Sequence, residues 1–161
     1  MKKIAIQVTL EVFEGLKTLP PEIQSIVIAA QEARENAYAP YSNFKVGAAI
    51  LLDSHDIVTG NNQENAAYPS GLCAERVAVF QAASKFPERM FKAIAIVAQS
   101  QDKTHQDPVP PCGACRQVLA EYEDKQDAPL SIYFTGNGQT IYKASSTKDI
   151  LPFVFSKAFL K

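Results

Sequence analysis

The three cysteines of this 161-residue chain fall in two short motifs. One is Cys-Ala-Glu-Arg at residues 73–76, and the other is Pro-Cys-Gly-Ala-Cys-Arg at residues 111–116. Three thiolates bind a zinc ion and leave its fourth coordination position open, which is the arrangement of a catalytic site rather than of a closed structural one. The sequence therefore predicts one catalytic Zn²⁺ per chain, held by Cys73, Cys112 and Cys115.

A carboxylate and two arginines accompany these cysteines. Glu75 lies two residues after Cys73, where it is placed to move protons for a water that the metal activates. Three thiolates give the metal centre a net charge of about −1, which weakens zinc as a Lewis acid. We expect Arg76 and Arg116 to donate hydrogen bonds to the sulfurs and restore that acidity.

The two motifs must be brought together by the elements that carry them. Apolar spacing predicts one helix over residues 73–85 and another over residues 112–123. Cys112 and Cys115 are three residues apart and so share one face of the second helix. If the two helix N-termini converge, the helix dipoles lower the pKa values of the thiols that meet there.

The rest of the chain alternates between strand and helix patterns. Strictly alternating apolar residues from Ile4 to Val12 predict a half-buried N-terminal strand, and Pro21 begins a predicted helix that continues to Ala37. Further strands are predicted over residues 44–52, 57–60, 91–98, 130–134 and 140–143, with a short helix over residues 147–150. This order predicts an α/β layered fold in a single domain, residues 1–161, to which residues 1–19 add an extra strand.

Composition and charge narrow the function classes. The net charge is −1 and no dense run of lysine and arginine occurs, which disfavours a nucleic-acid partner. No apolar stretch is long enough to span a membrane, and the N-terminus lacks the apolar run and cleavage site of a signal peptide. An odd number of cysteines argues against a secreted disulfide scaffold. We therefore expect a cytoplasmic protein with a small-molecule substrate.

Five separated segments together resemble the small, tetrameric cytidine deaminases. The Cys-x-Glu and Pro-Cys-x-x-Cys layout is the zinc deaminase signature. The similar segments are residues 39–49, 62–68, 73–76, 111–119 and 151–155, within a region from about Glu22 to Phe155. The resemblance implies a three-layer αβα fold with a mixed central sheet, and a homotetramer with shared active sites.

The resemblance also implies roles for individual residues. Asn62 and Glu64 would hold the ribose 3′-hydroxyl, in a segment that ends at Tyr68. Phe44 would pack on the pyrimidine, the backbone around Ala74 would contact the base, and Phe155 would reach into a neighbouring subunit's site. Glu75 would carry a proton from the attacking water to a ring nitrogen and then to the leaving amine.

The leading hypothesis is deamination of cytidine and deoxycytidine to the uridine forms, in pyrimidine salvage. Gln63 and residues 69–71 depart from the family's usual pattern beside the pocket, so another aminopyrimidine nucleoside, such as a nucleoside antibiotic, stays open as the substrate. A non-catalytic, zinc-stabilised binding module and a thiol–disulfide oxidoreductase are alternatives of other classes. The module would not need Glu75, and the oxidoreductase would leave Cys73 without a purpose.

Overall fold

The computed structural model describes residues 1–100, 107–136 and 139–160, and these contain a six-stranded mixed sheet. The strand order is β1-β6-β5-β4-β2-β3, with β4 and β5 parallel and every other pair antiparallel. The strands are β1 (Glu11–Phe13), β2 (Phe44–Leu52), β3 (Ile57–Asn61), β4 (Phe91–Ser100), β5 (Ser131–Thr135) and β6 (Ile141–Ala144).

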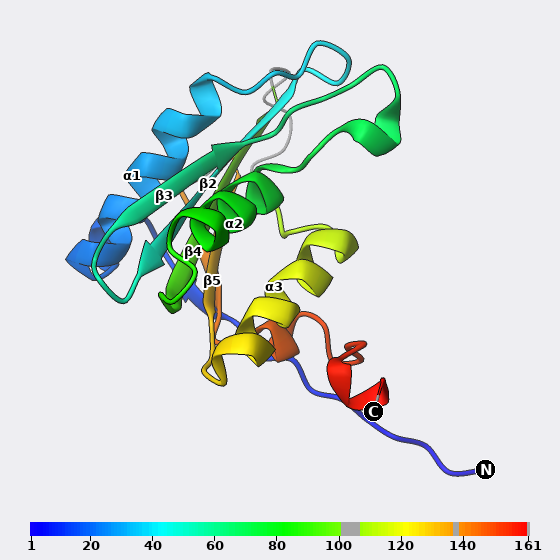
Figure 1. Ribbon diagram of the computed structural model, residues 1–161. Helices are drawn as coiled ribbons and strands as arrows, with labels where there is room; N and C mark the ends of the chain where they lie inside the picture. The colour runs from blue at the N-terminus through cyan, green and yellow to red at the C-terminus, as the bar shows by residue number, and fades with distance from the viewer. Residues whose placement is uncertain (101–106, 137–138, 161) are drawn as a thin grey trace.

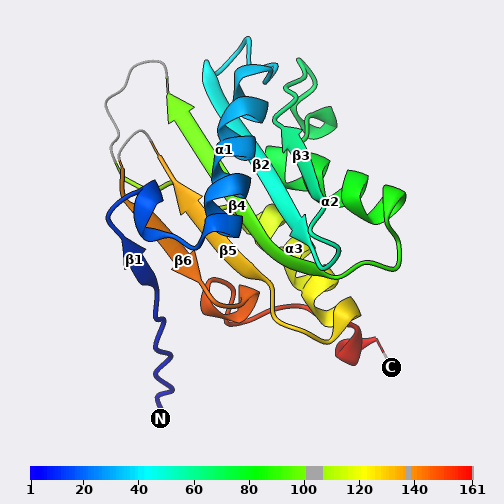
Figure 2. The ribbon, with the colours of Figure 1, turned by 90° about the vertical axis from the view of Figure 1, so that its left-hand side faces the viewer.

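Helices cover both faces of this sheet. They are α1 (Pro21–Glu35), α2 (Ala74–Lys85) and α3 (Gly113–Gln126), with short 3₁₀ helices at Leu16–Thr18, Tyr68–Ser70, Thr147–Asp149 and Lys157–Phe159. Helix α1 lies on one face, and α2 and α3 lie on the other (Figures 1 and 2). The predicted three-layer αβα fold with a mixed sheet is therefore confirmed.

The two core layers follow from the period of two along the central strands. Ile50 and Ile94 face α2 and α3, whereas Leu51 and Ala95 face α1. Because both faces are covered, these strands are apolar at nearly every position, as expected of central strands. None of the helices in the described ranges combines the length and apolar character that a membrane crossing needs.

The direction of the strands brings the two site helices together. Strand β3 is antiparallel to β2, which is antiparallel to β4, so β3 and β4 run the same way. Helices α2 and α3 are the next α-helices in the chain after β3 and β4, and both begin at the same end of the sheet's strands (Figure 1). Gly60 lets α2 approach β3 closely, since a Cβ there would lie 2.7 Å from the Ala74 carbonyl oxygen.

The predicted N-terminal strand is wrong over most of its length. Only Glu11–Phe13 forms a strand, and Leu10 before it packs against the core. Residues 1–9 are exposed and extend away from the body of the molecule (Figure 2). The reason is the length of the partner strand. Glu11 pairs with Lys143, so residues before about 10 would have to pair beyond Ala144, where β6 ends.

Candidate active site

Three thiols from two helix N-termini form a compact cluster. Cys73 is the N-cap of α2 and Cys112 is the N-cap of α3, with Cys115 in the first turn of α3. The Sγ atoms of Cys73 and Cys112 are 4.0 Å apart, those of Cys112 and Cys115 are 3.5 Å apart, and all three lie within 4.8 Å of one another. A tetrahedral zinc with bonds of about 2.3 Å holds sulfurs about 3.8 Å apart, whereas a disulfide needs about 2.05 Å. The cluster thus fits zinc.

The charge distribution of the cluster favours a thiolate at Cys73. The Cys115 thiol, and after it the Arg76 guanidinium, lower the pKa of Cys73 to about 5. Arg76 Nη2 lies 3.7 Å from Cys73 Sγ, because a residue three positions along a helix shares the face of the first. The hydrogen bond between the Cys115 and Cys73 side chains, together with burial, raises the pKa of Cys115. Cys115 therefore ionises when a cation replaces its proton.

Glu75 lies in the first turn of α2 and is only 5% exposed. Burial raises the pKa of its carboxyl, and the negative charge of Cys73 raises it further. A hydrogen bond from the Cys115 thiol opposes these effects. A buried carboxyl with a raised pKa is suited to taking up and giving back a proton.

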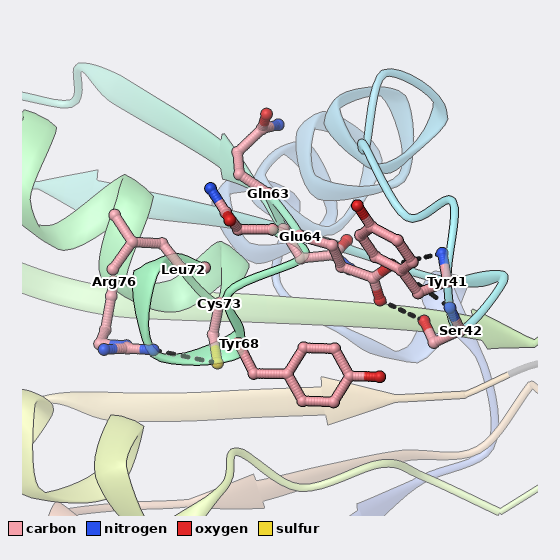
Figure 3. Close-up of a pocket in the computed structure, with 11 residues that line it drawn as sticks. Tyr41, Ser42, Gln63, Glu64, Tyr68, Leu72, Cys73 and Arg76 are labelled. Atoms are coloured by element: carbon pink, nitrogen blue, oxygen red, sulfur yellow. Dashed lines mark hydrogen bonds between the residues drawn. The ribbon is translucent and has the colours of Figure 1, made fainter.

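A cavity of about 380 Å³ opens beside Cys73 (Figure 3). Its volume falls in the range of small-molecule sites. Its walls come from three parts of the chain: the loop before β2, the segment after β3, and the residues around the N-terminus of α2. The lining includes five of the predicted site residues: Asn62, Glu64, Tyr68, Cys73 and Arg76. Cys73 is the member of the thiol cluster that lines the cavity, at one end, and the other end carries a carboxylate.

Glu64 forms that other end. Its Oε2 accepts hydrogen bonds from the backbone N–H groups of Tyr41, at 2.9 Å, and Ser42, at 3.3 Å, and its Oε1 accepts one from the Ser42 hydroxyl (Figure 3). These donors, the Ser42 hydroxyl first, lower the pKa of Glu64. A carboxylate held in this way stays ionised and presents an acceptor to the cavity.

Asn62 fixes the start of β2 rather than pointing freely into the cavity. Its Oδ1 accepts from the backbone N–H of Val46 at 2.8 Å, and its Nδ2 donates to the Phe44 carbonyl at 2.9 Å. Phe44 is half-buried at the first position of β2, next to the Ser42–Glu64 contact, but is not among the cavity-lining residues. Asn62 therefore holds the backbone on which the predicted base-packing Phe44 is mounted.

Backbone hydrogen bonds join the carboxylate end to the metal end. Gln63 and Leu72 exchange two bonds, each of 2.9 Å, and the Glu64 N–H donates to the Tyr38 carbonyl at 2.8 Å. These bonds hold the two segments side by side, with Glu64 next to Gln63 in one segment and Cys73 next to Leu72 in the other. Between them, Tyr68 projects with 78% of its surface exposed, its ring centroid 6.5 Å from that of Tyr41.

Known proteins are similar to this chain in sequence and in fold. The family model for the cytidine and deoxycytidylate deaminase zinc-binding region matches residues 21–127. The cytidine deaminase of Sporosarcina psychrophila is 42% identical over 136 residues, which is 84% of this chain and 93% of that protein. A probable cytidine deaminase of Dictyostelium discoideum is 35% identical over 136 residues, covering 84% and 85%. The chain belongs to the cytidine and deoxycytidylate deaminase family.

Solved structures agree with this membership. Cytidine deaminase from Burkholderia pseudomallei has a TM-score of 0.71 at 41% identity, covering 81% of this chain and 97% of that one. Cytidine deaminase from Mycobacterium tuberculosis has a TM-score of 0.64 at 33% identity, covering 83% and 96%. The metal of the cluster is therefore zinc, and this deaminase is a hydrolytic enzyme.

Seven of the predicted site residues are not among those that line the cavity: Phe44, Ala74, Glu75, Cys112, Cys115, Arg116 and Phe155. Ala74 is fully buried at the first position of α2, where its backbone adjoins Cys73. Phe155 is 59% exposed in the C-terminal segment and stacks on Phe159, with ring centroids 5.9 Å apart. It does not line the cavity of its own chain, so its predicted role in a neighbouring site stays a prediction.

Arg116 is placed differently from the sequence prediction. Its Nε donates to the Pro111 carbonyl at 2.8 Å, and its Nη1 donates to the Ile150 carbonyl at 2.7 Å. These two groups thus donate to carbonyl oxygens rather than to a sulfur, and the prediction that Arg116 donates to a thiolate stays a prediction. Arg116 directly follows Cys115, and one residue turns a helix by about 100°, which directs the guanidinium away from that thiol.

Sequence reasoning missed several residues of the carboxylate end. Tyr41 and Ser42 line the cavity and contact Glu64, and Asn65 and Leu72 also line it. Tyr41 and Ser42 do fall within one of the segments that carried the family resemblance. The sequence signal for a tight turn beside them is Asn43, because asparagine is favoured at positive φ. The structure shows that turn, with a φ of 54° at Asn43.

Proposed function

We propose that this deaminase converts cytidine and deoxycytidine to uridine and deoxyuridine, with release of ammonia, in pyrimidine salvage. The observation that carries the proposal is the cavity, which has Cys73 of the zinc-binding thiol cluster at one end and an ionised carboxylate, Glu64, at the other. A nucleoside has matching ends, since its base carries the amine to be removed and its ribose carries hydroxyl donors. The relatives named cytidine deaminase support the same substrate.

Cys73, Cys112 and Cys115 would hold the zinc, which supplies Lewis-acid activation of water when bound. Glu75 takes the proton that the attacking water loses, and its buried carboxyl holds it. It delivers this proton to the ring nitrogen of the base. It then takes the second proton, from the hydroxyl group that has added to the ring carbon, and gives it to the leaving amine. One water is consumed and one ammonia leaves, and Glu75 ends in the state in which it began.

The ribose is held by Glu64, with Asn62 and Tyr68 at the same end of the cavity. The Oε1 atom that accepts from the Ser42 hydroxyl is the one we assign to the ribose 3′-hydroxyl, since both donors are alcohols. A carboxylate repels a phosphate at that position. The site therefore prefers a free nucleoside over a 3′-linked nucleic acid.

Assembly and location belong to the same proposal. We propose a homotetramer in which Phe155 of one subunit reaches a neighbour's site, supported by the family resemblance and by the exposure of Phe153 and Phe155. Residues 1–161 form one domain. A cytoplasmic location is supported by three free thiols at metal-binding distances, which a reducing compartment preserves. Light scattering on the purified protein measures the subunit number.

The deciding experiment is a direct assay. Purified protein is mixed with cytidine, the ultraviolet spectrum and ammonia are followed, and zinc is quantified in the same sample. We expect one zinc per chain and loss of the cytidine band with one ammonia per uridine. Full zinc without turnover of cytidine or deoxycytidine would overturn the substrate, and a panel of other aminopyrimidine nucleosides would then identify it. A zinc-loaded protein inactive on all of them would be a binding module.

A further inference from the structure

The C-terminal segment is attached to the helix that carries two of the zinc ligands. Arg116 in α3 spans two carbonyl groups, donating from Nε to Pro111 at 2.8 Å and from Nη1 to Ile150 at 2.7 Å. Pro111 is fully buried and directly precedes Cys112. The guanidinium therefore joins the ligand turn, residues 111–112, to Ile150, which lies 34 residues after Arg116 in the chain.

The Ile150 end of this connection is itself anchored. Glu123, a buried carboxylate near the end of α3, accepts bonds from the Thr147 N–H at 2.9 Å, the Thr147 hydroxyl at 3.0 Å and the Ser146 hydroxyl at 2.6 Å. The Leu151 N–H donates to the Thr147 carbonyl at 2.8 Å. The chain from Ser146 to Leu151, which we call the C-terminal anchor, is thus fixed to α3 before it meets Arg116.

The planar fork of an arginine suits this position, because two donors at a fixed separation hold two carbonyls at a fixed separation. A lysine would carry the same charge but could not span both oxygens in one geometry. Ligand turns tolerate little displacement, since groups that orient metal ligands typically contribute 10- to 100-fold in metal affinity or activity.

We infer that Arg116 is a positioning residue that locks the ligand turn onto the C-terminal anchor, so that the seating of the anchor sets the position of Cys112 and Cys115. Its function is then geometric rather than electrostatic. Arg76, which does contact a sulfur, supplies the charge. The inference rests on the zinc site of the proposed function and adds to it a second determinant, outside the cavity.

Charge and geometry are separated by Arg116→Lys and Arg116→Gln. Each protein is loaded with zinc, and its release to a chromophoric chelator is timed; the cobalt-loaded forms give the thiolate-to-metal absorption bands. We expect both variants to release metal about tenfold faster or more, and to shift the cobalt bands, because both lose the fork. If Arg116→Lys behaves as the wild type while Arg116→Gln fails, the residue acts by charge and the inference is overturned.

The anchor is tested without touching Arg116. Thr147→Val removes one hydroxyl from the Glu123 cluster and keeps the backbone bond. We expect a smaller acceleration of metal release, about threefold, with altered cobalt bands; unchanged bands and release would overturn the coupling. This variant also decides the matter if Arg116→Lys cannot be purified in a folded state.

The matched control is Lys157→Gln, which removes an exposed ion pair of 3.0 Å to Asp124 in the same part of the chain. It should leave metal release and cobalt bands unchanged; if it changes them as Thr147→Val does, the effect is a general loosening and the coupling is refuted. The wild type separates the two proposals. A wild-type protein that binds no zinc would overturn the proposed function. If the wild type is zinc-loaded and active, and the Arg116 and Thr147 variants have the same zinc release and cobalt bands as the wild type, only this inference is overturned.

Discussion

The two ends of the cavity are built in opposite ways. At the metal end, Cys115 is fully buried and Glu75 nearly so, and both belong to helices packed on the central sheet. At the ribose end, Glu64 lies outside the helices and strands, and Tyr68 begins a single 3₁₀ turn and is mostly exposed. The first end is held by the core, and the second is held by backbone hydrogen bonds between loops.

This difference indicates how the two ends contribute to turnover. Groups in a packed core keep one geometry, which proton transfer requires, whereas exposed loops open at low free-energy cost and can admit a substrate. Substitutions at the metal end should therefore lower kcat, and substitutions at the ribose end should raise KM. The predictions below test that division.

The largest effect is expected for Glu75→Gln. Glutamine has nearly the same volume as glutamate but cannot accept and return a proton, so kcat should fall by about 10⁴-fold or more while KM changes little. Steady-state kinetics on cytidine, with zinc quantified in the same sample, measures it. Glu121→Gln, an exposed change in α3, is the control and should be neutral. A fall in kcat of less than tenfold would remove Glu75 from the proton transfers.

The metal end was predictable because its information is local. Cys112 and Cys115 are three residues apart, so helix geometry places them on one face. Cys73 and Glu75 both fall at the start of one predicted helix. The strand over residues 44–52 was likewise predicted with the bounds that the structure shows, since a long apolar run depends on no distant partner for its recognition. Convergence of the two helix N-termini was only a condition of the sequence prediction, and the strand directions now explain it.

The ribose end and the outer contacts were less predictable because they join distant residues. The Ser42–Glu64 bond spans 22 residues, and the Arg116–Ile150 bond spans 34. Composition cannot choose among the many acceptors an arginine might reach. The predicted length of the N-terminal strand was wrong for a related reason. Alternation of apolar residues predicts a strand, but the partner strand sets its length, and β6 supplies only four residues.

An intermediate effect is expected for Arg76→Gln. Arg76 is the cation beside Cys73, and its loss should lower kcat/KM about 10- to 100-fold, mostly through kcat. In zinc-free protein the same change should raise the pKa of Cys73 above about 5, because the thiolate loses a hydrogen-bond donor and a positive charge. The pH dependence of thiol alkylation reports that pKa directly. An unchanged alkylation midpoint would show that Arg76 does not stabilise the thiolate.

The smallest effect, and the sharpest test of the division, is expected for Glu64→Gln. The amide oxygen can still accept a hydrogen bond, so only the advantage of a charged acceptor is lost, about 1 to 1.5 kcal/mol, or about tenfold in KM with kcat nearly unchanged. Loosening of the loop that carries Tyr41 and Ser42 could raise KM without any contact to the ribose. The substrate 3′-deoxycytidine separates the two causes, since it lacks the hydroxyl that Glu64 is proposed to bind. If the contact is real, wild type should discriminate against 3′-deoxycytidine and Glu64→Gln should discriminate about tenfold less. Equal discrimination by both proteins would mean that Glu64 orders the loop and that the ribose is held elsewhere.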